Sequence, residues 1–315
     1  MIFIFPGQGV QFVGMGQQFV NMFSVARIVF EEVDDALGYS LSKLIKNGPI
    51  EELTMTEHAQ PAIMATSMAI LQSLLLEMAL PFSRISTCAL GHSLGEYSAL
   101  CAAGSLSVWD AAKILKIRGV AMSNACCNGA MVAILGFDIT SLNQLLAEAN
   151  KVAFCQFAND NTEDQVVISG YVSAIDFIIN NYKDFGIKKV IRLNVGGPFH
   201  SHLMSDAANA LSAGLEHIAI YNPVLPIISN VTAQPVSNSS EIARLLVSQI
   251  TSKVRWRESV LYAAENSSGS FIEIGPGSVL TKMVKKIVPN VNVYNISSPK
   301  DIDSILDFFK ENMDF

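Results

Sequence analysis

A serine stands between two glycines in Gly91-His92-Ser93-Leu94-Gly95, the pattern of a nucleophile elbow. The residues before it, Thr87–Leu90, are apolar and compatible with a strand, and helical spacing begins at Leu94. On such a sharp strand-to-helix turn the serine hydroxyl is exposed, and glycines two positions away let the strand and the helix approach each other. The N-terminus of the following helix points N–H groups at an oxyanion formed there. The motif therefore predicts Ser93 as a nucleophile.

A histidine is the side chain best suited to take a proton from a serine near neutral pH. Two of the five histidines lie in the loop Gly196-Gly197-Pro198-Phe199-His200-Ser201-His202, just before a predicted helix. We predict His200 as the base and keep His202 as the alternative, because spacing does not decide which ring faces Ser93. His92 lies inside the elbow, where alternation directs its side chain away from the serine.

Three further features could bind an anion. Arg118 has apolar neighbours on both sides of its helix, so it either extends to solvent or points inward at an anion; from the helix alone the first is favoured. Gln8 follows an apolar run and stands between glycines, where it could offer an N–H or amide to a ligand, or form an ordinary turn. Gly275-Pro276-Gly277 could cradle a phosphate, but without a P-loop lysine an ordinary turn is favoured.

The elements around these residues alternate between strands and helices, which is typical of an α/β fold with a parallel sheet. The predicted strands are 1–5, 87–90, 225–229, 270–274 and, at the edge, 291–296. The predicted helices are 15–23, 26–37, 41–45, 59–78, 94–103, 108–126, 204–215, 241–250, 256–266, 279–287 and 302–309.

The segment from Gly129 to Arg192 has a different order of predicted strands and helices. Strands are predicted at 130–135, 152–157, 166–169 and 187–193, helices at 140–149 and 172–182, and a polar turn at 159–164. The order βαββαβ is the split ferredoxin-like pattern, and about sixty residues of it can form a separate small lobe. We therefore expect a large subdomain from residues 1–127 and 196–315, and a small subdomain from residues 128–195.

Composition excludes several classes of protein. A hydrophobic content of 50% and a charged content of 16% provide a large core and argue against disorder. The net charge of -7 and the lack of basic runs argue against nucleic-acid binding. The five cysteines fit no metal pattern and suggest reduced core residues of a cytoplasmic protein: Cys88, Cys101, Cys126, Cys127 and Cys155. No basic leader precedes the first strand, and the charge-free stretch 58–76 contains polar residues, so a core helix is expected rather than a signal peptide or membrane span.

Six segments occur in an order that resembles a known family. They are Phe5-Pro6-Gly7-Gln8-Gly9, Gly91-His92-Ser93-Leu94-Gly95-Glu96, Arg118-Gly119, Gln165-Val166-Val167-Ile168-Ser169-Gly170, Pro198-Phe199-His200-Ser201 and Glu273-Ile274-Gly275-Pro276-Gly277. Together they resemble the malonyl-CoA:acyl-carrier-protein transacylases of type II fatty acid synthesis, over nearly the whole chain. The resemblance implies a large α/β-hydrolase-like lobe with a parallel sheet, into which a small ferredoxin-like lobe is inserted.

The resemblance also implies roles for individual residues. It makes Ser93 the acylated nucleophile, His200 its base and Arg118 the partner of the malonyl carboxylate. The backbone N–H groups of Gln8 and Leu94 would form the oxyanion hole. The remaining substrate-site positions are Gln249, near a backbone carbonyl that orients the histidine; His92; Asn159, near the mouth of the site; and Phe199, which is associated with malonyl over branched acyl groups. Glu163 departs from the proline that relatives often carry.

The expected function is therefore ping-pong transfer of a malonyl group from malonyl-CoA to the phosphopantetheine thiol of an acyl carrier protein, without metal or redox cofactor. The alternatives are a serine esterase or thioesterase, an acyltransferase component of polyketide synthesis, and a catalytically silent docking subunit. A monomer that binds no membrane is expected. Because carrier proteins are acidic, two basic groups are candidate docking sites: Lys188, Lys189 and Arg192, and Lys282, Lys285 and Lys286.

Overall fold

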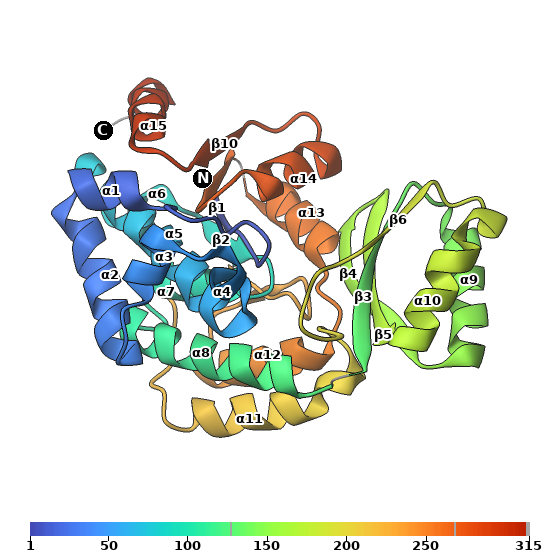
Figure 1. Ribbon diagram of the computed structural model, residues 1–315. Helices are drawn as coiled ribbons and strands as arrows, with labels where there is room; N and C mark the ends of the chain where they lie inside the picture. The colour runs from blue at the N-terminus through green and yellow to red at the C-terminus, as the bar shows by residue number, and fades with distance from the viewer. Residues whose placement is uncertain (127, 268, 313–315) are drawn as a thin grey trace.

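The computed structural model describes residues 1–126, 128–267 and 269–312, and these residues form two β-sheets (Figure 1). The larger sheet contains β1 (Ile2–Phe5), β2 (Cys88–Gly91), β7 (Ile227–Ile228), β8 (Pro235–Val236), β9 (Phe271–Ile274) and β10 (Val293–Ile296). Its strand order is β10-β9-β1-β2-β7-β8. All neighbours from β10 to β7 are parallel, whereas β8 pairs antiparallel with β7 at the edge. The predicted parallel sheet is confirmed, with β10 at one edge.

Helices pack against both faces of the larger sheet. One face is covered by α13 (Trp256–Asn266) and α14 (Val279–Ile287). The remaining helices outside the small sheet contribute to one hydrophobic cluster on and around the other face of the larger sheet. They are α1 (Gln17–Met22), α2 (Ser24–Leu37), α3 (Leu41–Asn47), α4 (Ile50–Thr54), α5 (Thr56–Met78), α6 (Phe82–Ile85), α7 (Gly95–Ala102), α8 (Val108–Asn124), α11 (Ser205–Leu215), α12 (Ser239–Thr251) and α15 (Pro299–Asn312).

The central strand β1 is buried on both faces. Ile2 and Ile4 contact the cluster under α13 and α14, whereas Phe3 and Phe5 join the cluster on the opposite face. A strand in the middle of a parallel sheet is covered on both sides, so each of its alternating side chains must be apolar. This is why the N-terminal run contains no polar residue.

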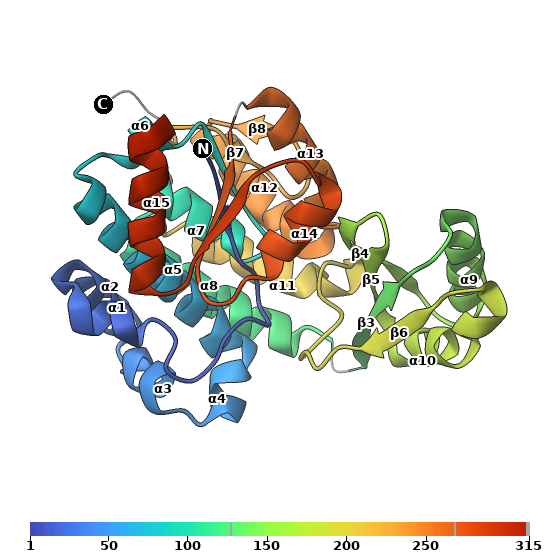
Figure 2. The same ribbon diagram turned by 90° about the horizontal axis from the view of Figure 1, so that it is seen from above.

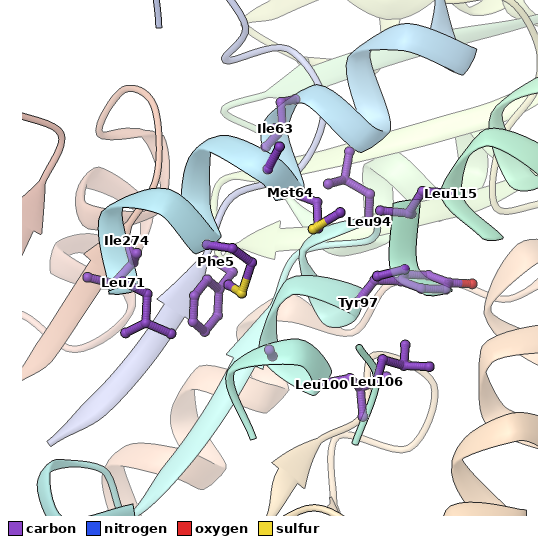
Figure 3. Close-up of a cluster of buried hydrophobic side chains, with 14 of the residues drawn as sticks. Phe5, Ile63, Met64, Leu71, Leu94, Tyr97, Leu100, Leu106, Leu115 and Ile274 are labelled. Carbon is purple, nitrogen blue, oxygen red and sulfur yellow. The ribbon is translucent and has the colours of Figure 1, made fainter. Parts of the chain in front are cut away.

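The longest helix, α5, lies against this sheet. Figure 3 shows Ile63, Met64 and Leu71 of α5 beside Phe5 and Ile274 of the sheet. The helix is long and apolar enough to cross a membrane, but 72% of its most apolar window is buried inside the protein. Such burial is what a core helix of a soluble protein requires, and it agrees with the interpretation of residues 58–76.

The second sheet is antiparallel. Its strands are β3 (Gly129–Leu135), β4 (Cys155–Thr162), β5 (Gln165–Tyr171) and β6 (Lys189–Arg192), in the order β4-β5-β3-β6. The helices α9 (Ile139–Val152) and α10 (Val172–Asn181) cover the face that is turned away from the larger sheet (Figures 1 and 2). The order of elements, β3-α9-β4-β5-α10-β6, is the predicted βαββαβ order.

The two faces of this small sheet have different partners. In β3, Val132 and Ile134 pack against the cluster that contains α9 and α10. The alternate side chains, Met131 and Ala133, belong instead to the main hydrophobic cluster of the protein. Because successive side chains of a strand point to opposite faces, β3 attaches its own helices on one side and the larger part of the protein on the other.

One sequence interpretation was wrong here. Residues 159–164 were predicted as a polar turn, but β4 continues through Thr162 and only Glu163 and Asp164 connect it to β5. The preceding strand also begins later than predicted, at Cys155, because α9 extends to Val152. The polar residues of β4 are buried because their partners come from outside the sheet: the side chain of Asp160 accepts two hydrogen bonds from Arg257 of α13, both at 3.1 Å.

Candidate active site

The elbow has the geometry that its glycines predicted. The strand β2 ends at Gly91, Ser93 has a φ of 54°, and α7 starts at Gly95. A Cβ atom added to Gly91 would lie 1.9 Å from the carbonyl carbon of Gly95, and one added to Gly95 would lie 2.2 Å from the carbonyl oxygen of Phe5. Both distances are far below van der Waals contact. Only glycine at these two positions therefore permits the turn that presents the serine.

His200, and not His202, faces the serine. Its Nε2 atom lies 2.8 Å from the Ser93 hydroxyl oxygen, and its Nδ1 atom lies 2.9 Å from the main-chain carbonyl oxygen of Gln249. A carbonyl can only accept, so Nδ1 carries the proton and Nε2 accepts from the serine hydroxyl. His202 is exposed, and its ring lies beside Phe154. The ambiguity that spacing left is thereby resolved.

His200 is held as a neutral imidazole. It is 3% exposed and has a φ of 57°. Burial, with the nearby Arg118 cation as the next cause, lowers the pKa of His200 to about 3. A neutral ring with a free Nε2 lone pair is the form that can accept a proton from a serine.

Arg118 points inward, against the preference that its helix alone suggested. The side chain is 1% exposed, and Nη2 donates to the Ser93 hydroxyl at 3.0 Å and to the Gln249 side-chain oxygen at 2.9 Å. Nη1 donates to the side-chain oxygen of Gln60 at 2.7 Å, and the guanidinium carbon lies 5.5 Å from the centre of the Tyr97 ring. Among the described residues no carboxylate forms an ion pair with it. A buried cation next to a serine, with neutral partners only, can accept a ligand anion.

A pocket of about 330 Å³ opens over the serine; it is lined by the small sheet and by residues that follow β1 and β2 of the larger sheet. Met131 and Val167 line it from the small sheet. Of the residues singled out in the sequence, it brings together Gln8, His92, Ser93, Leu94, Arg118, Asn159, Phe199 and His200. Gln249 lies behind Arg118 and does not line the pocket.

The pocket also contains backbone donors. Among the described residues, no acceptor is found for the backbone N–H of Gln8 or of Leu94. Leu94 immediately precedes α7, so its N–H belongs to the positive end of that helix. His92 has a different arrangement, because its Nε2 atom lies 2.9 Å from the side-chain oxygen of Asn161. Its ring is therefore tied to β4 of the small sheet.

Sequence reasoning missed three residues that hold the site together. Asn230 accepts a hydrogen bond from the Ser93 N–H at 2.7 Å and donates to the Gly91 carbonyl at 2.7 Å. The other two are Gln60 and Glu96, which contact Arg118 and Gln249 respectively. Signals were available for all three: an asparagine just after a buried strand, a glutamine in a charge-free helix, and an acid directly after the elbow.

The start of α14 does not offer a phosphate site. The carboxylate of Glu273 accepts hydrogen bonds from the backbone N–H groups of Leu280 at 3.1 Å and Thr281 at 2.7 Å. These are the helix N-terminal donors that a phosphate would need. Gly275-Pro276-Gly277 therefore acts as the ordinary turn that the sequence favoured.

The cysteines and possible metal ligands lie outside this chemistry. Cys88 and Cys155 are buried and free, whereas Cys101 and Cys126 are free and partly buried and pack against the outside of the main hydrophobic cluster. Cys127 lies outside the described residues. In the described part of the chain, no group of three or more histidine, cysteine or acidic side chains could hold a metal ion.

A serine hydroxyl on an elbow, an imidazole within hydrogen-bond distance and N–H donors at a helix start form an arrangement that suits nucleophilic acyl chemistry. The family described as "acyl transferase domain" matches residues 2–312. The chain therefore belongs to the acyl transferase domain family.

Curated relatives and solved structures agree. The chain is 40% identical over 315 residues to the malonyl CoA-acyl carrier protein transacylase of Bacillus subtilis (strain 168), covering 99% of this chain and 98% of that protein. The enzyme of the same name from Escherichia coli (strain K12) is 34% identical over 307 residues, covering 97% of this chain and 98% of that protein. The crystal structure of the acyl-carrier-protein-S-malonyltransferase from Bartonella henselae matches with a TM-score of 0.95 and 40% identity, covering 98% of this chain and 99% of that one. A malonyl-transacylase in complex with a type II polyketide acyl-carrier protein matches with a TM-score of 0.92 and 35% identity, covering 98% of this chain and 99% of that one.

Proposed function

We propose that the protein transfers a malonyl group from malonyl-CoA to the phosphopantetheine thiol of an acyl carrier protein. The observation that carries this proposal is the position of Arg118, whose guanidinium is buried, lies 3.0 Å from the Ser93 hydroxyl and has no carboxylate partner among the described residues. A plain esterase has no use for such a cation, whereas an acyl group that ends in a carboxylate does. The names of the relatives support the same substrate.

The chemistry takes two steps through a malonyl-serine. The Ser93 hydroxyl gives its proton to Nε2 of His200 and attacks the thioester carbonyl, and the backbone N–H groups of Gln8 and Leu94 stabilise the oxyanion. The C–S bond breaks, and the proton on His200 passes to the CoA thiolate. In the second step the carrier thiol gives its proton to His200 and attacks the ester, and the serine recovers its proton as the malonyl thioester leaves.

Several finer assignments complete the proposal. The larger part, residues 1–127 and 196–315, corresponds to an α/β-hydrolase-like subdomain, and residues 128–195 to a ferredoxin-like one, since their strands have the order β4-β5-β3-β6. Acyl transfer between two thiols changes no oxidation state, and the base and the oxyanion donors are protein groups, so the reaction needs no metal or redox cofactor. The protein would work as a cytoplasmic monomer.

The substrate-site residues have separate roles in this proposal. Asn159 and Phe199 shape the pocket over the serine, and His92 is fixed at its edge by Asn161. The side chain of Gln249 holds Arg118, and its main-chain carbonyl orients His200.

The carrier protein is proposed to approach over basic side chains beside the pocket mouth. Lys282, Lys285 and Lys286 lie on α14, whose Leu280 and Met283 line the pocket. Lys286 forms an exposed ion pair with Asp164, which is weak in water and can exchange for a carrier carboxylate. Lys188, Lys189 and Arg192 form the other candidate group. Charge reversal in either group should slow transfer to the carrier without slowing loading from malonyl-CoA.

The experiment is acyl loading followed by intact-protein mass spectrometry. The wild-type protein mixed with malonyl-CoA should gain one malonyl group, and Ser93→Ala should gain none. A malonyl group that still becomes attached to Ser93→Ala would refute the assignment.

Adding an acyl carrier protein should move the malonyl group from Ser93 to the carrier thiol. Release of free malonate without a carrier would indicate a thioesterase instead. Comparing carriers of fatty acid and polyketide synthesis would decide between these pathways, since one structural relative is in complex with a type II polyketide acyl-carrier protein.

A further inference from the structure

An acidic side chain lies buried behind the serine and has no role in the mechanism. Glu96, the second residue of α7, is 3% exposed. Its Oε2 atom accepts hydrogen bonds from Nε2 of Gln249 at 2.7 Å and from the backbone N–H of Asn230 at 3.2 Å. Among the described residues no cation forms an ion pair with it. A carboxylate in such surroundings is costly unless an opposite charge lies near.

The nearest such charge is one amide group away. The side chain of Gln249 stands between Glu96 and Arg118: its Nε2 donates to Glu96 at 2.7 Å and to the Ser93 carbonyl at 3.1 Å, and its Oε1 accepts from Arg118 at 2.9 Å. A flipped amide would turn its oxygen toward a carboxylate and its N–H groups toward a cation. Glu96 and Arg118 therefore fix the same orientation of the amide from opposite ends.

The other partner of the guanidinium is also a neutral amide. Nη1 of Arg118 donates to Oε1 of Gln60 at 2.7 Å, and Gln60 is 1% exposed. Two amide oxygens thus hold the guanidinium in position without neutralising it. A carboxylate at either place would pair with Arg118 directly and would compete with any carboxylate on a substrate.

We propose that Glu96 balances the buried charge of Arg118 through the Gln249 amide, and that this spacing reserves the guanidinium for a carboxylate on the acyl group. Glu96 is then a positioning residue, and the neutral amides at Gln60 and Gln249 determine the preference for acidic acyl groups. The inference rests on the proposed malonyl transfer, because it concerns how the same site selects its acyl group.

The pKa of Glu96 reflects two opposing effects in this arrangement. Burial raises the pKa of Glu96 to about 7, while the Gln249 and Asn230 donors and the Arg118 cation act in the opposite direction. Above this pH the pair carries no net charge, so the site is balanced before any acyl group enters. Experiments on the pair therefore belong at pH 8, where Glu96 is an anion.

The test exchanges the acid and the amide. The double variant Glu96→Gln with Gln249→Glu keeps the same two functional groups and the same net charge, but it places the carboxylate directly on Arg118. Glu96→Gln alone is the matched control, because it loses the charge and keeps the amide at position 249. Loading of Ser93 from malonyl-CoA and from acetyl-CoA is measured for each by mass spectrometry, and Tm is measured at pH 8.

The variants should separate charge balance from acyl preference. Glu96→Gln should be more destabilising, measured by Tm, when Arg118 is present than in an Arg118→Met background, because only the pair gains from charge balance, and it should keep the preference for malonyl. The double variant Glu96→Gln with Gln249→Glu should lose malonyl loading by about 100-fold or more relative to acetyl loading, the scale of a lost buried charge pair. An unchanged malonyl preference in that double variant, equal losses with both acyl groups, or the same Tm change for Glu96→Gln in both backgrounds would overturn the proposal.

If the double variant does not fold, a second variant can still refute the proposal. Gln60→Glu places a carboxylate on the other side of Arg118 and leaves Glu96 and Gln249 intact. It should also lose malonyl loading selectively, and retention of the wild-type preference would overturn the proposal. Failure of the wild-type protein to load malonyl at all would instead refute the proposed function, so the two failures are distinguishable.

Discussion

The pH dependence of stability gives a direct test of the buried base. The pKa of His200 is lowered to about 3 in the folded protein, by burial first and Arg118 second. In the unfolded chain the same ring has an ordinary pKa of about 6.5. Between these values the unfolded state binds a proton that the folded state does not. Stability therefore falls as pH is lowered from about 6.5 toward 3, by up to about 1.4 kcal/mol for each pH unit.

Other buried groups change the free energy of unfolding with pH in the opposite direction, so their contribution must be subtracted. Burial raises the pKa of Glu96 to about 7 and also raises the pKa of Glu273. Such a carboxyl binds its proton more readily in the folded protein, so it adds stability as pH falls below its folded pKa. The contribution of His200 is isolated by comparing wild type with His200→Gln, because both carry the same carboxyl groups.

The assay is urea unfolding at pH 8.0, 6.5 and 5.0, with linear extrapolation to water. Lowering the pH from 6.5 to 5.0 should destabilise wild type by about 1.6 kcal/mol relative to His200→Gln, a little less than the full slope over about 1.5 pH units, because at pH 6.5 the unfolded ring is only half protonated. Malonyl loading of free Glu96→Gln, in which position 96 no longer titrates, should show no loss of a base with an apparent pKa near 6.5. A constant difference in stability between the two proteins, or such a titration in the loading rate, would show that the folded imidazole protonates normally and would refute the reasoning.

Two further substitutions test the anion site and the elbow. Arg118→Ala should reduce loading from malonyl-CoA by about 100-fold or more, the scale of a lost buried charge pair, with a smaller loss from acetyl-CoA; equal losses, measured by initial rates with both thioesters, would count against pairing with the carboxylate. Gly91→Ala should prevent stable folding or lower Tm strongly, because its Cβ would lie 1.9 Å from the carbonyl carbon of Gly95. Gly104→Ala is the contrasting variant, since a Cβ there meets no atom within 4 Å, whereas its φ of 68° adds a backbone strain that Gly91 does not have; a fall in Tm for Gly104→Ala as large as that for Gly91→Ala would count against the close approach as the cause.

The elbow could be predicted from the sequence because its determinants are local. Strand, glycine, serine, glycine and helix follow one another within a few residues, and each is required by the turn itself. The base could not be chosen in the same way, because His200 and His202 are two residues apart in one irregular loop. The structure distinguishes them through the positive φ of His200 and the Gln249 carbonyl that accepts its Nδ1–H.

The wrong turn at residues 159–164 has a tertiary cause. A run of polar side chains is typical of a loop, because buried polar groups need partners. Here the partners exist but are remote in sequence: Asn159 forms a β-bridge with Val254, and Asp160 pairs with Arg257. Register shifts between Phe157 and Thr162 accommodate this strand. Local composition cannot reveal partners that lie about a hundred residues further along the chain.

The orientation of Arg118 has the same kind of cause and a functional consequence. Its helix shows a cation among apolar residues, which is compatible with either direction. The direction is decided by Gln60 and Gln249, which are uncharged and lie 58 and 131 residues away in the chain. Gln60 does not contact the elbow, whereas the Gln249 amide also donates to the Ser93 carbonyl at 3.1 Å. It follows that a change of the Gln60 amide should alter which acyl group is accepted while the serine and its base keep their geometry, whereas a change of the Gln249 side chain also removes a contact to the nucleophile.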